Sequence, residues 1–455
     1  MLIAPADVGR FEHDFWNQYQ GRAAAVLRPG TAAEVAAVVA LAARHRVALV
    51  PQAGNTGLVN GGIPDQTGTQ AVLSVERLNR IRAVDPAGDY LIAEAGCILD
   101  AVQNTAAEAN RLFPLALGSS GSCRIGGNLA TNAGGLNVLR YGMARDLVLG
   151  LEVVLPDGAI LDLLKPLRKD NTGYDLKQLF LGSEGTLGII TAAALRLAAR
   201  PRERVTLWLA VDTPERAIAL FKTFRDEFGE LISAFELLGS EGVEIAVGRL
   251  PGVRRPVAAP APWHVLIELA WTFADGLRLK ADAMLERIFA EGLSTDGAIA
   301  ESEAQRANMW RLREGQSESA SGLGYILRSD VAVAIADLPA LLHWTGAQQA
   351  RLQGSGIRVL PFGHAGDGNL HVNYLLPHGS PESLHQELLG ALFDKVGQLG
   401  GSISAEHGVG RAKRAAVSAQ QSATARSLAQ RLKHALDPLG LMNPGVVLAG
   451  PDDQD

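Results

Sequence analysis

The sequence predicts an α+β protein of two domains with a short helical C-terminal segment. Its 455 residues are more than one simple core usually organises. Helix-like and strand-like stretches alternate over the first 200 residues, around glycine-rich segments. After Pro201 the order strand, helix, strand occurs twice, which is typical of an antiparallel sheet backed by helices. We therefore expect one domain at 1–200, a second at 201–405, and a segment at 406–455 that packs back on the first.

The composition is that of an ordinary globular protein. Apolar residues make up 47% and charged residues 20%, which is too apolar for a disordered chain. A net charge of −6 gives no reason to expect a nucleic-acid partner. Two cysteines, Cys97 and Cys123, are too few for a disulfide framework or a cysteine-rich metal site. Neither a signal peptide nor an apolar run of about 18 residues is evident, so we expect a cytoplasmic protein without a membrane span.

The elements of the first domain follow from local patterns. The stretch 31–46 has helical apolar spacing, and Thr31 is placed to cap it. A short buried strand then runs into the glycine- and asparagine-rich loop of "VALVPQAGNTGLVNGG". We predict further strands at 71–78 and 90–99, and a helix at 100–112.

Two glycine loops in this domain suit phosphate binding. They are "GNTG" (54–57) and "GSSGSCRIGGNLATNAGG" (118–135). Glycine lets backbone N–H groups approach an anion, and successive amides can hold phosphate oxygens without a lysine. Neither loop has the GxGxxG pattern or the Gly-Lys-Ser/Thr ending of a phosphate loop, which disfavours a Rossmann fold. Either loop alone is as well explained by a turn, but together they indicate a dinucleotide site.

The second domain is predicted from two repeated units and a hairpin. Residues 202–239 and 262–302 each read strand, helix, strand, and a Pro/Ala/Arg-rich link joins them at 251–262. Residues 358–377 read as two strands around the turn "HAGDGN". A domain of this kind either supplies substrate contacts or only shields a cofactor.

Histidines on that hairpin raise the possibility of a metal site. His364 and His371 flank the turn, and alternation along the second strand puts His371 and Asn373 on one face. The stretch "ISAEHGVG" adds Glu406 and His407, and two histidines with one glutamate are a catalytic zinc pattern. A hydrogen-bonded polar loop is the alternative. Asp367, between glycines, is expected to stabilise the turn rather than bind metal.

Three long stretches resemble a known superfamily. "PQAGNTGLVNGG", "GSSGSCRIGGNLATNAGGLNVLRYG" and "DNTGYDLKQLFLGSEGTLGIIT" are similar to the FAD-contacting segments of the vanillyl-alcohol-oxidase-type flavoproteins. The resemblance is greatest to the D-2-hydroxyacid dehydrogenases and extends to "LDPLGLMNPGVVL" near the C-terminus. It implies a two-part FAD-binding domain at the N-terminal end and an antiparallel-sheet cap, or substrate, domain over the flavin.

The resemblance also implies which residues contact FAD. The pyrophosphate is expected at Pro51, Gly54, Asn55, Thr56 and Gly57. The flavin is expected beside Gly118, Ser119, Ser122, Gly126, Asn128, Thr131 and Ala133. The adenosine or the dimethylbenzene edge is expected at Glu184, Gly185 and Ile190. Members with covalent FAD often have a histidine where this chain has Asn55, and Cys123 is expected to be a buried packing residue, so we expect noncovalent FAD.

The "GHxGDGNLH" and "EHG" signatures resemble those of the zinc-dependent D-2-hydroxyglutarate dehydrogenases. By that resemblance the ligands of Zn²⁺, or of Mn²⁺ or Co²⁺, are His364, His371 and Glu406. His407 matches the catalytic histidine, which also contacts substrate, and Asn373 matches a substrate-binding asparagine. In "NMWRLREGQSESASGLGYILRSD", the expected substrate contacts are Arg313, Ser317, which replaces a threonine, and Arg328, which replaces a lysine.

The chemistry implied is the FAD- and metal-dependent oxidation of a D-2-hydroxyacid to the 2-oxoacid. A divalent metal stabilises the alkoxide, a histidine takes the proton, and flavin accepts the hydride. Two arginines and a hydroxyl suit a dicarboxylate, so the conversion of D-2-hydroxyglutarate to 2-oxoglutarate is favoured. The alternatives are a D-lactate or other monocarboxylate dehydrogenase, a glycolate-oxidase-like flavin subunit without its own turnover, and an oxygen-using oxidase. We expect an electron-transfer flavoprotein or a quinone as acceptor, and a homodimer.

Overall fold

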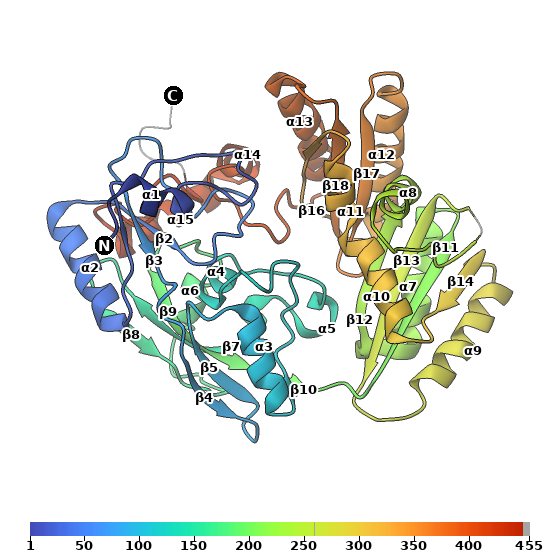
Figure 1. The fold of residues 1–455 in the computed structure, drawn as a ribbon, viewed down its shortest axis with the longest axis horizontal. Helices are drawn as coiled ribbons and strands as arrows, with labels where there is room; N and C mark the ends of the chain where they lie inside the picture. Colours follow the sequence, from blue (N-terminus) through green and yellow to red (C-terminus); the bar gives the residue numbers. More distant parts are fainter. Residues whose placement is uncertain (259, 449–455) are drawn as a thin grey trace. The chain divides into compact units, whose positions relative to one another are not determined.

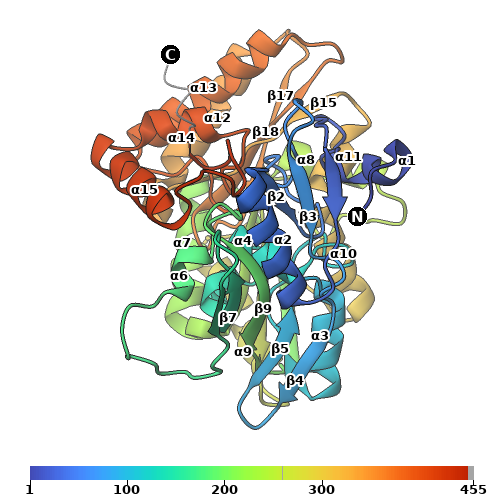
Figure 2. The ribbon, with the colours of Figure 1, turned by 90° about the vertical axis from the view of Figure 1, so that its left-hand side faces the viewer.

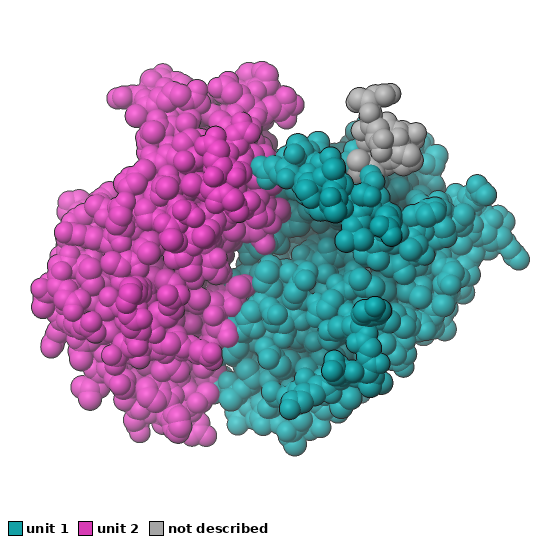
Figure 3. All heavy atoms as spheres, turned by 180° about the vertical axis from the view of Figure 1, so that it is seen from behind, with its two compact units in different colours: residues 1–135, 141–200, 406–455 teal, residues 136–140, 201–405 magenta. Residues whose placement is uncertain are grey.

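The computed structural model describes residues 1–258 and 260–448. The chain divides into two compact units, which Figure 3 colours separately. Unit 1 comprises Met1–Gly135, Tyr141–Arg200 and Glu406–Asp455, and unit 2 comprises Leu136–Arg140 and Pro201–Ala405. Each unit contains both helices and sheets (Figure 1), so the predicted α+β class is confirmed.

Unit 1 contains a parallel sheet and an antiparallel sheet. The parallel sheet has the order β1 (Ala25–Leu27), β3 (Ala71–Ser74) and β2 (Leu49–Gln52). The antiparallel sheet has the order β4 (Ile81–Asp85), β5 (Tyr90–Glu94), β9 (Ile189–Arg196), β7 (Val148–Val154) and β8 (Ile160–Leu163). The short strands β6 (Arg111–Leu112) and β10 (Ala198–Ala199) form a third pair.

Helices cover these sheets. In the N-terminal part of unit 1 they are α1 (Pro5–Val8), η1 (Gly9–Phe11), α2 (Ala32–His45), α3 (Leu99–Glu108), α4 (Ile125–Ala130), η2 (Ala144–Leu147) and α6 (Lys177–Phe180). Most of α5 (Val138–Tyr141) belongs to the short segment Leu136–Arg140 of unit 2. Thr31 caps α2 as predicted, because its side chain accepts a hydrogen bond from the N–H of Glu34. Val35 and Val39 of α2 pack with Leu73 of β3, and Figure 2 shows α2 beside this parallel sheet.

The predicted helix at 100–112 is shorter than expected. Helix α3 ends at Glu108, and Asn110 adopts a left-handed conformation with a φ of +55°. Arg111 and Leu112 then pair with β10. Asparagine tolerates this conformation, and the strand pairing outweighs the helical pattern of the last residues.

The C-terminal segment of unit 1 is helical, as predicted. It contains α14 (Arg414–Gln420) and α15 (Ala423–Leu436). The ammonium of Lys433 donates to the carbonyl oxygens of Thr186 and Met442, each at 2.7 Å, and to the carboxylate of Asp437. The side-chain amide of Asn443 donates to the carbonyl oxygen of Gly61 at 2.9 Å. These bonds tie the segment to the glycine-rich part of the same unit.

Unit 2 is built on one antiparallel sheet. Its order is β14 (Asp296–Ile299), β11 (Glu203–Val211), β13 (Trp263–Trp271), β12 (Ile232–Gly239), β17 (Arg358–Gly363), β18 (Asn369–Leu376) and β15 (Tyr325–Leu327), with β16 (Val331–Ala332) also paired to β18. Its helical elements are α7 (Pro214–Phe228), η3 (Gly229–Leu231), α8 (Ser240–Arg249), α9 (Leu277–Ala290), α10 (Glu303–Glu314), α11 (Gln316–Ser321), η4 (Ile335–Asp337), α12 (Leu338–Arg351) and α13 (Glu382–Gln398). Both predicted strand–helix–strand units and the hairpin are present.

The two faces of this sheet are packed by different helices. Trp208 and Leu238 point to the face covered by α8 and α10, where they join Leu312 in one apolar cluster. Phe235, the neighbour of opposite parity on β12, instead contacts Phe221 of α7, with ring centroids 4.9 Å apart. Even-numbered positions of β12 therefore face α8 and α10, and the buried Glu236 is one of them.

Candidate functional site

The two predicted histidines flank the turn of the β17–β18 hairpin. Phe362 is opposite His371 in the strand register. Gly363 must lack a side chain, because a Cβ there would lie 2.7 Å from the carbonyl oxygen of Asn369. The tight turn places His364 beside His371, with ring centroids 5.7 Å apart. Both rings are buried.

A buried carboxylate joins His364 to a predicted substrate residue. The carboxylate of Glu236 on β12 lies 2.8 Å from Nδ1 of His364 and accepts a hydrogen bond from Nε of Arg313 at 2.5 Å. Burial disfavours the charged carboxylate, but the charge of Arg313 and the contact with His364 outweigh it and lower the pKa of Glu236 to about 2. Arg313, from α10, also lies over the ring of Phe362, 5.1 Å from its centroid. Arg313 is therefore held in an ion pair inside unit 2.

The other predicted substrate residues lie on neighbouring elements. The side-chain amide of Asn373 donates to the hydroxyl of Ser317 at 3.3 Å, and its oxygen accepts from the N–H of Ser329 at 3.1 Å. Arg328 directly precedes Ser329 and is half-buried. Burial lowers the pKa of Arg328, which means that the fold partly desolvates its positive charge.

Asp330 is a site residue that the sequence did not suggest. It is fully buried, and its carboxylate accepts from the side-chain amide of Asn369 and from the N–H of Ala405, each at 3.0 Å. In the sequence it stands inside the apolar stretch "ILRSDVAVAI". An acidic residue within a strand-like apolar run was the available signal, since buried carboxylates need partners.

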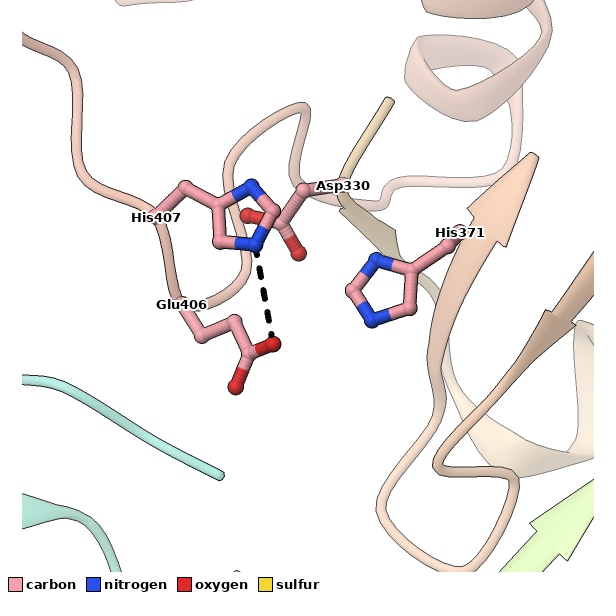
Figure 4. Close-up of side chains that lie close together, drawn as sticks. All are labelled: Asp330, His371, Glu406 and His407. Atoms are coloured by element: carbon pink, nitrogen blue, oxygen red, sulfur yellow. Dashed lines mark ion pairs between the residues drawn. The ribbon is translucent and has the colours of Figure 1, made fainter. Parts of the chain in front are cut away.

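Four side chains form a group that can hold a metal ion. The bond from Ala405 to Asp330 places the start of the "EHG" stretch, and Glu406 and His407 are the next two residues. Asp330, His371, Glu406 and His407 each offer one ligand atom, and these atoms lie within 4.8 Å of one another (Figure 4). Nε2 of His407 is 3.7 Å from Oε1 of Glu406.

The donor set of this group fits a divalent ion. Zinc binds imidazole nitrogen and carboxylate oxygen at about 2.0–2.2 Å, so its ligand atoms lie within about 4.4 Å of one another. The observed limit of 4.8 Å is close to this value, and two nitrogens with two oxygens suit zinc, manganese or cobalt. His371 and Glu406 belong to the group as expected, whereas His364 lies next to it and contacts Glu236 and Arg313.

Two glycine loops of unit 1 present backbone amides that bond to no described residue. These N–H groups belong to Asn55, Thr56, Gly57, Gly118 and Ser119. Asn55 adopts a left-handed φ of +54°, as expected for an amide nest. No described atom lies within 4 Å of a Cβ built on Gly57 or on Gly118. Such a row of unused donors beside open space fits the pyrophosphate of a dinucleotide.

The remaining predicted cofactor residues pack within unit 1, and some of them join the two loops. A Cβ on Gly54 would lie 2.6 Å from the carbonyl oxygen of Ser122, so the loops touch backbone to backbone. The side-chain amide of Asn128 contacts the sulfur of Cys123 at 3.6 Å, and burial raises the pKa of this thiol. Gly126 packs closely against Ala95, and Gly185 packs closely against Pro51. The hydroxyl of Thr131 donates to the carbonyl oxygen of Gly127, and the N–H of Ala133 donates to the carbonyl oxygen of Asn128. Ile190 lies in the apolar core.

Glu184, which is expected beside the cofactor, also holds the chain segment that follows the "EHG" stretch. Its carboxylate oxygens accept from the N–H groups of Val409, at 2.7 Å, and Gly410, at 2.9 Å. Glu406, three residues earlier than Val409, accepts from the N–H of Gly135 at 2.8 Å. These bonds hold the stretch that carries Glu406 and His407.

Two family models match the chain. Residues 23–164 match the model described as "FAD binding domain". Residues 200–447 match the model described as "FAD linked oxidases, C-terminal domain". The matches cover both glycine loops, the histidine hairpin and the "EHG" stretch.

Several curated relatives are similar over nearly the whole of this chain. The mitochondrial D-2-hydroxyglutarate dehydrogenase of Bos taurus is 39% identical over 435 residues, which is 95% of this chain and 78% of the relative. The D-2-hydroxyglutarate dehydrogenase of Xanthomonas citri pv. viticola is 37% identical, covering 97% of this chain and 92% of the relative. A putative mitochondrial D-lactate dehydrogenase of Schizosaccharomyces pombe is 36% identical, covering 97% and 84%.

Solved structures share the fold at low identity. p-Cresol methylhydroxylase superposes with a TM-score of 0.75 at 14% identity, covering 98% of this chain and 93% of that one. 4-Ethylphenol oxidase from Gulosibacter chungangensis gives a TM-score of 0.74 at 19% identity, covering 99% and 94%. At these identities the likeness concerns the fold alone.

The comparisons do not support the cytoplasmic location that we expected from the sequence. Among the described residues, no helix combines the length and the apolar character that crossing a membrane requires. Several relatives carry mitochondrial names, which do not support the expected cytoplasmic location.

Proposed function

Because this chain belongs to the FAD-linked oxidases of the vanillyl-alcohol-oxidase type, and within them to the family of the D-2-hydroxyglutarate dehydrogenases, we propose that it oxidises a D-2-hydroxyacid to the 2-oxoacid. The predicted fold class is confirmed by the same comparisons. D-2-hydroxyglutarate is the substrate that we favour.

The observation that carries the proposal is the donor group Asp330, His371, Glu406 and His407. A divalent ion in this group supplies a Lewis acid that lowers the cost of forming an alkoxide from the substrate hydroxyl. We propose zinc, with manganese or cobalt as substitutes. The chain contributes two imidazoles and two carboxylates, so the net charge of an occupied site is close to zero when both histidines are neutral.

His407 is the residue that we propose takes the hydroxyl proton. A neutral imidazole accepts a proton at a nitrogen that bears a lone pair, and Nε2 of His407 lies beside Glu406. Positioning follows from the backbone, since Val409 and Gly410 are bonded to Glu184. Separate measurement of metal content and of flavin reduction rate in His407→Asn distinguishes a base from a metal ligand.

The amides of the two glycine loops are the proposed cradle for the FAD pyrophosphate. Bound FAD supplies the oxidising power, as the acceptor of two electrons from the substrate. We propose that it is bound noncovalently, because Asn55 stands where covalent members have a histidine and Cys123 is buried in the apolar core. The one charged residue of the two loops, Arg124, donates to the carbonyl oxygen of Gly96, so the proposed cradle consists of backbone amides.

Recognition of a dicarboxylate is assigned to unit 2. The charge of Arg313 is balanced by Glu236, whereas the charge of Arg328 is partly desolvated, so binding of a second carboxylate offsets a cost at Arg328. Ser317 and Asn373, which are hydrogen-bonded to each other, add polar contacts. This arrangement favours D-2-hydroxyglutarate over D-lactate, which lacks the second carboxylate.

Reduction of the bound flavin by a panel of D- and L-2-hydroxyacids tests the function directly. Under anaerobic conditions we expect bleaching by D-dicarboxylates, loss of bleaching after EDTA treatment, and recovery with zinc. Full activity of metal-depleted protein contradicts the metal proposal. Bleaching by D-lactate at least as fast as by D-2-hydroxyglutarate favours the monocarboxylate alternative, and no bleaching by any hydroxyacid favours a flavin subunit without turnover.

A pair of glycine substitutions tests the cofactor cradle. In Gly57→Ala the new methyl group meets no described atom within 4 Å and enters the space beside the free amides. We expect unchanged apoprotein stability and an FAD affinity at least about tenfold weaker, which is about 1.4 kcal/mol. In the control Gly54→Ala the methyl group meets Ser122, so we expect apoprotein stability to fall by about 1–3 kcal/mol. Flavin fluorescence titration and urea unfolding separate the two effects; undiminished FAD affinity in Gly57→Ala rules out this cradle.

The electron acceptor and assembly are proposed from the resemblance. We propose an electron-transfer flavoprotein, or else a quinone, as the acceptor, and a homodimer in solution. Rapid peroxide formation in air marks an oxidase instead, and this is measured in the same assays.

A further inference from the structure

Glu236 occupies a central place among the polar residues of unit 2. It lies on the face of β12 that packs against α8 and α10, and its side chain is 1% exposed. One oxygen contacts Nδ1 of His364 at 2.8 Å and the other contacts Nε of Arg313 at 2.5 Å. Burial of a carboxylate is costly, and its place beside two functional side chains calls for an explanation beyond packing.

We infer that Glu236 is a positioning residue that determines which nitrogen of His364 carries the proton and how Arg313 is oriented. A carboxylate held by Arg313 can only accept hydrogen bonds, so Nδ1 of His364 must be the donor. In a neutral ring the lone pair is then at Nε2. Nη2 of Arg313 lies 3.2 Å from Nε2 and 3.4 Å from Nδ1 of the same ring, so this contact does not select a tautomer. The tautomer is assigned from the contact between Nδ1 and the carboxylate of Glu236.

The consequence concerns the side of His364 that is turned away from Glu236. Nε2 then presents a lone pair, which is the form of a histidine nitrogen that can bind a metal ion or accept a hydrogen bond. Glu236 also holds Arg313 through Nε, so the remaining nitrogens of the guanidinium are directed by the same carboxylate. One side chain thereby couples His364, the histidine that lies beside the proposed metal group, to a proposed substrate contact; this link to chemistry rests on the proposed function.

A glutamine at this position cannot satisfy both partners. Its amide offers one acceptor oxygen and one donor NH₂ group. If the oxygen faces Nε–H of Arg313, the NH₂ group faces Nδ1 of His364, which must then accept, and its proton moves to Nε2. If the amide is reversed, its NH₂ group faces a nitrogen of Arg313 that can only donate. Glu236→Gln should therefore invert the tautomer of His364 or displace Arg313.

Glu268 provides a matched control on the same face of the sheet. It is a buried glutamate of β13 that accepts from Nε of Arg306 and from Nε1 of Trp310, each at 2.8 Å, and both partners lie on α10. Its carboxylate also accepts from the hydroxyl of Thr206 at 3.1 Å, and none of these three partners is a histidine. Glu268→Gln should cost stability like Glu236→Gln but leave His364 unchanged.

The tautomer of His364 is measured directly in metal-free protein. We expect ¹H–¹⁵N correlation spectra of ¹⁵N-histidine-labelled wild type to show Nδ1 protonated in His364, assigned by comparison with His364→Asn. In Glu236→Gln we expect this pattern to be lost, metal affinity to fall by about 10- to 100-fold, and KM for D-2-hydroxyglutarate to rise. Glu268→Gln should keep the wild-type pattern, metal affinity and KM.

Two outcomes overturn the inference. The first is a wild-type protein in which Nε2 of His364 carries the proton, which decides the matter even if Glu236→Gln does not fold. The second is a folded Glu236→Gln protein that keeps Nδ1 protonated and binds metal as well as Glu268→Gln does. Because the spectra need neither substrate nor turnover, a protein that oxidises no hydroxyacid leaves this test intact.

Discussion

Replacing His407 by asparagine should slow anaerobic flavin reduction by about 10²- to 10⁴-fold. The reason is the loss of the imidazole that we propose takes the hydroxyl proton. Asparagine is close in size and can still make hydrogen bonds, but it cannot accept a proton at neutral pH. FAD content should be unchanged, because His407 is remote in sequence from both glycine loops and contributes no backbone amide to the cradle. Stopped-flow measurement at saturating D-2-hydroxyglutarate gives the rate.

The metal content of His407→Asn distinguishes two roles. His407 offers a ligand atom to the group with Asp330, His371 and Glu406 (Figure 4), so it is able to ligate an ion as well as move a proton. Retained metal with a lost rate identifies it as the base, whereas loss of both identifies it as a ligand. A rate equal to that of the wild type removes it from either role. The control is His343→Asn, since His343 pairs with Glu215 on the surface.

Replacing Asp330 by asparagine should abolish the thermal stabilisation that zinc confers on the protein. A ligand that binds only the folded state stabilises it in proportion to RT ln(1 + [L]/Kd), so a weaker site gives a smaller shift of Tm. Removing an anionic ligand should weaken binding by more than the 10- to 100-fold typical of outer partners. Activity should fall in parallel and recover only at high metal concentration.

The metal-free form of Asp330→Asn should not be destabilised to the same extent. Two carboxylates, those of Asp330 and Glu406, lie in one group, and without an ion their repulsion opposes folding. The variant removes that repulsion but weakens the hydrogen bonds from Asn369 and Ala405. Scanning calorimetry with and without zinc measures both effects. An unchanged zinc-induced shift of Tm excludes Asp330 as a ligand; exposed Asp226 on α7, changed to asparagine, is the control.

Local patterns were sufficient to predict most of the elements. Helix α2 begins after Thr31 because a threonine side chain accepts from the third residue beyond it, a contact within one turn of chain. The β17–β18 hairpin follows from alternation and a glycine-containing turn. The end of α3 was misjudged because Arg111 and Leu112 pair with β10, a strand almost ninety residues later. Pairing over such a distance leaves no local trace.

For the candidate site, too, local sequence accounts for one part and tertiary structure for the other. The sequence by itself determined the residue types, since "GHAGDGNLH" and "AEHG" supply imidazoles and a carboxylate near glycines that permit tight turns. Only the tertiary structure decided the partners: Asp330 enters the donor group, and Glu236 joins His364 to Arg313. Glu236 lies on β12 and Asp330 directly precedes β16, far along the chain from the groups that they contact. A buried carboxylate in an apolar run is explained only by the cationic or hydrogen-bonding groups that folding brings to it.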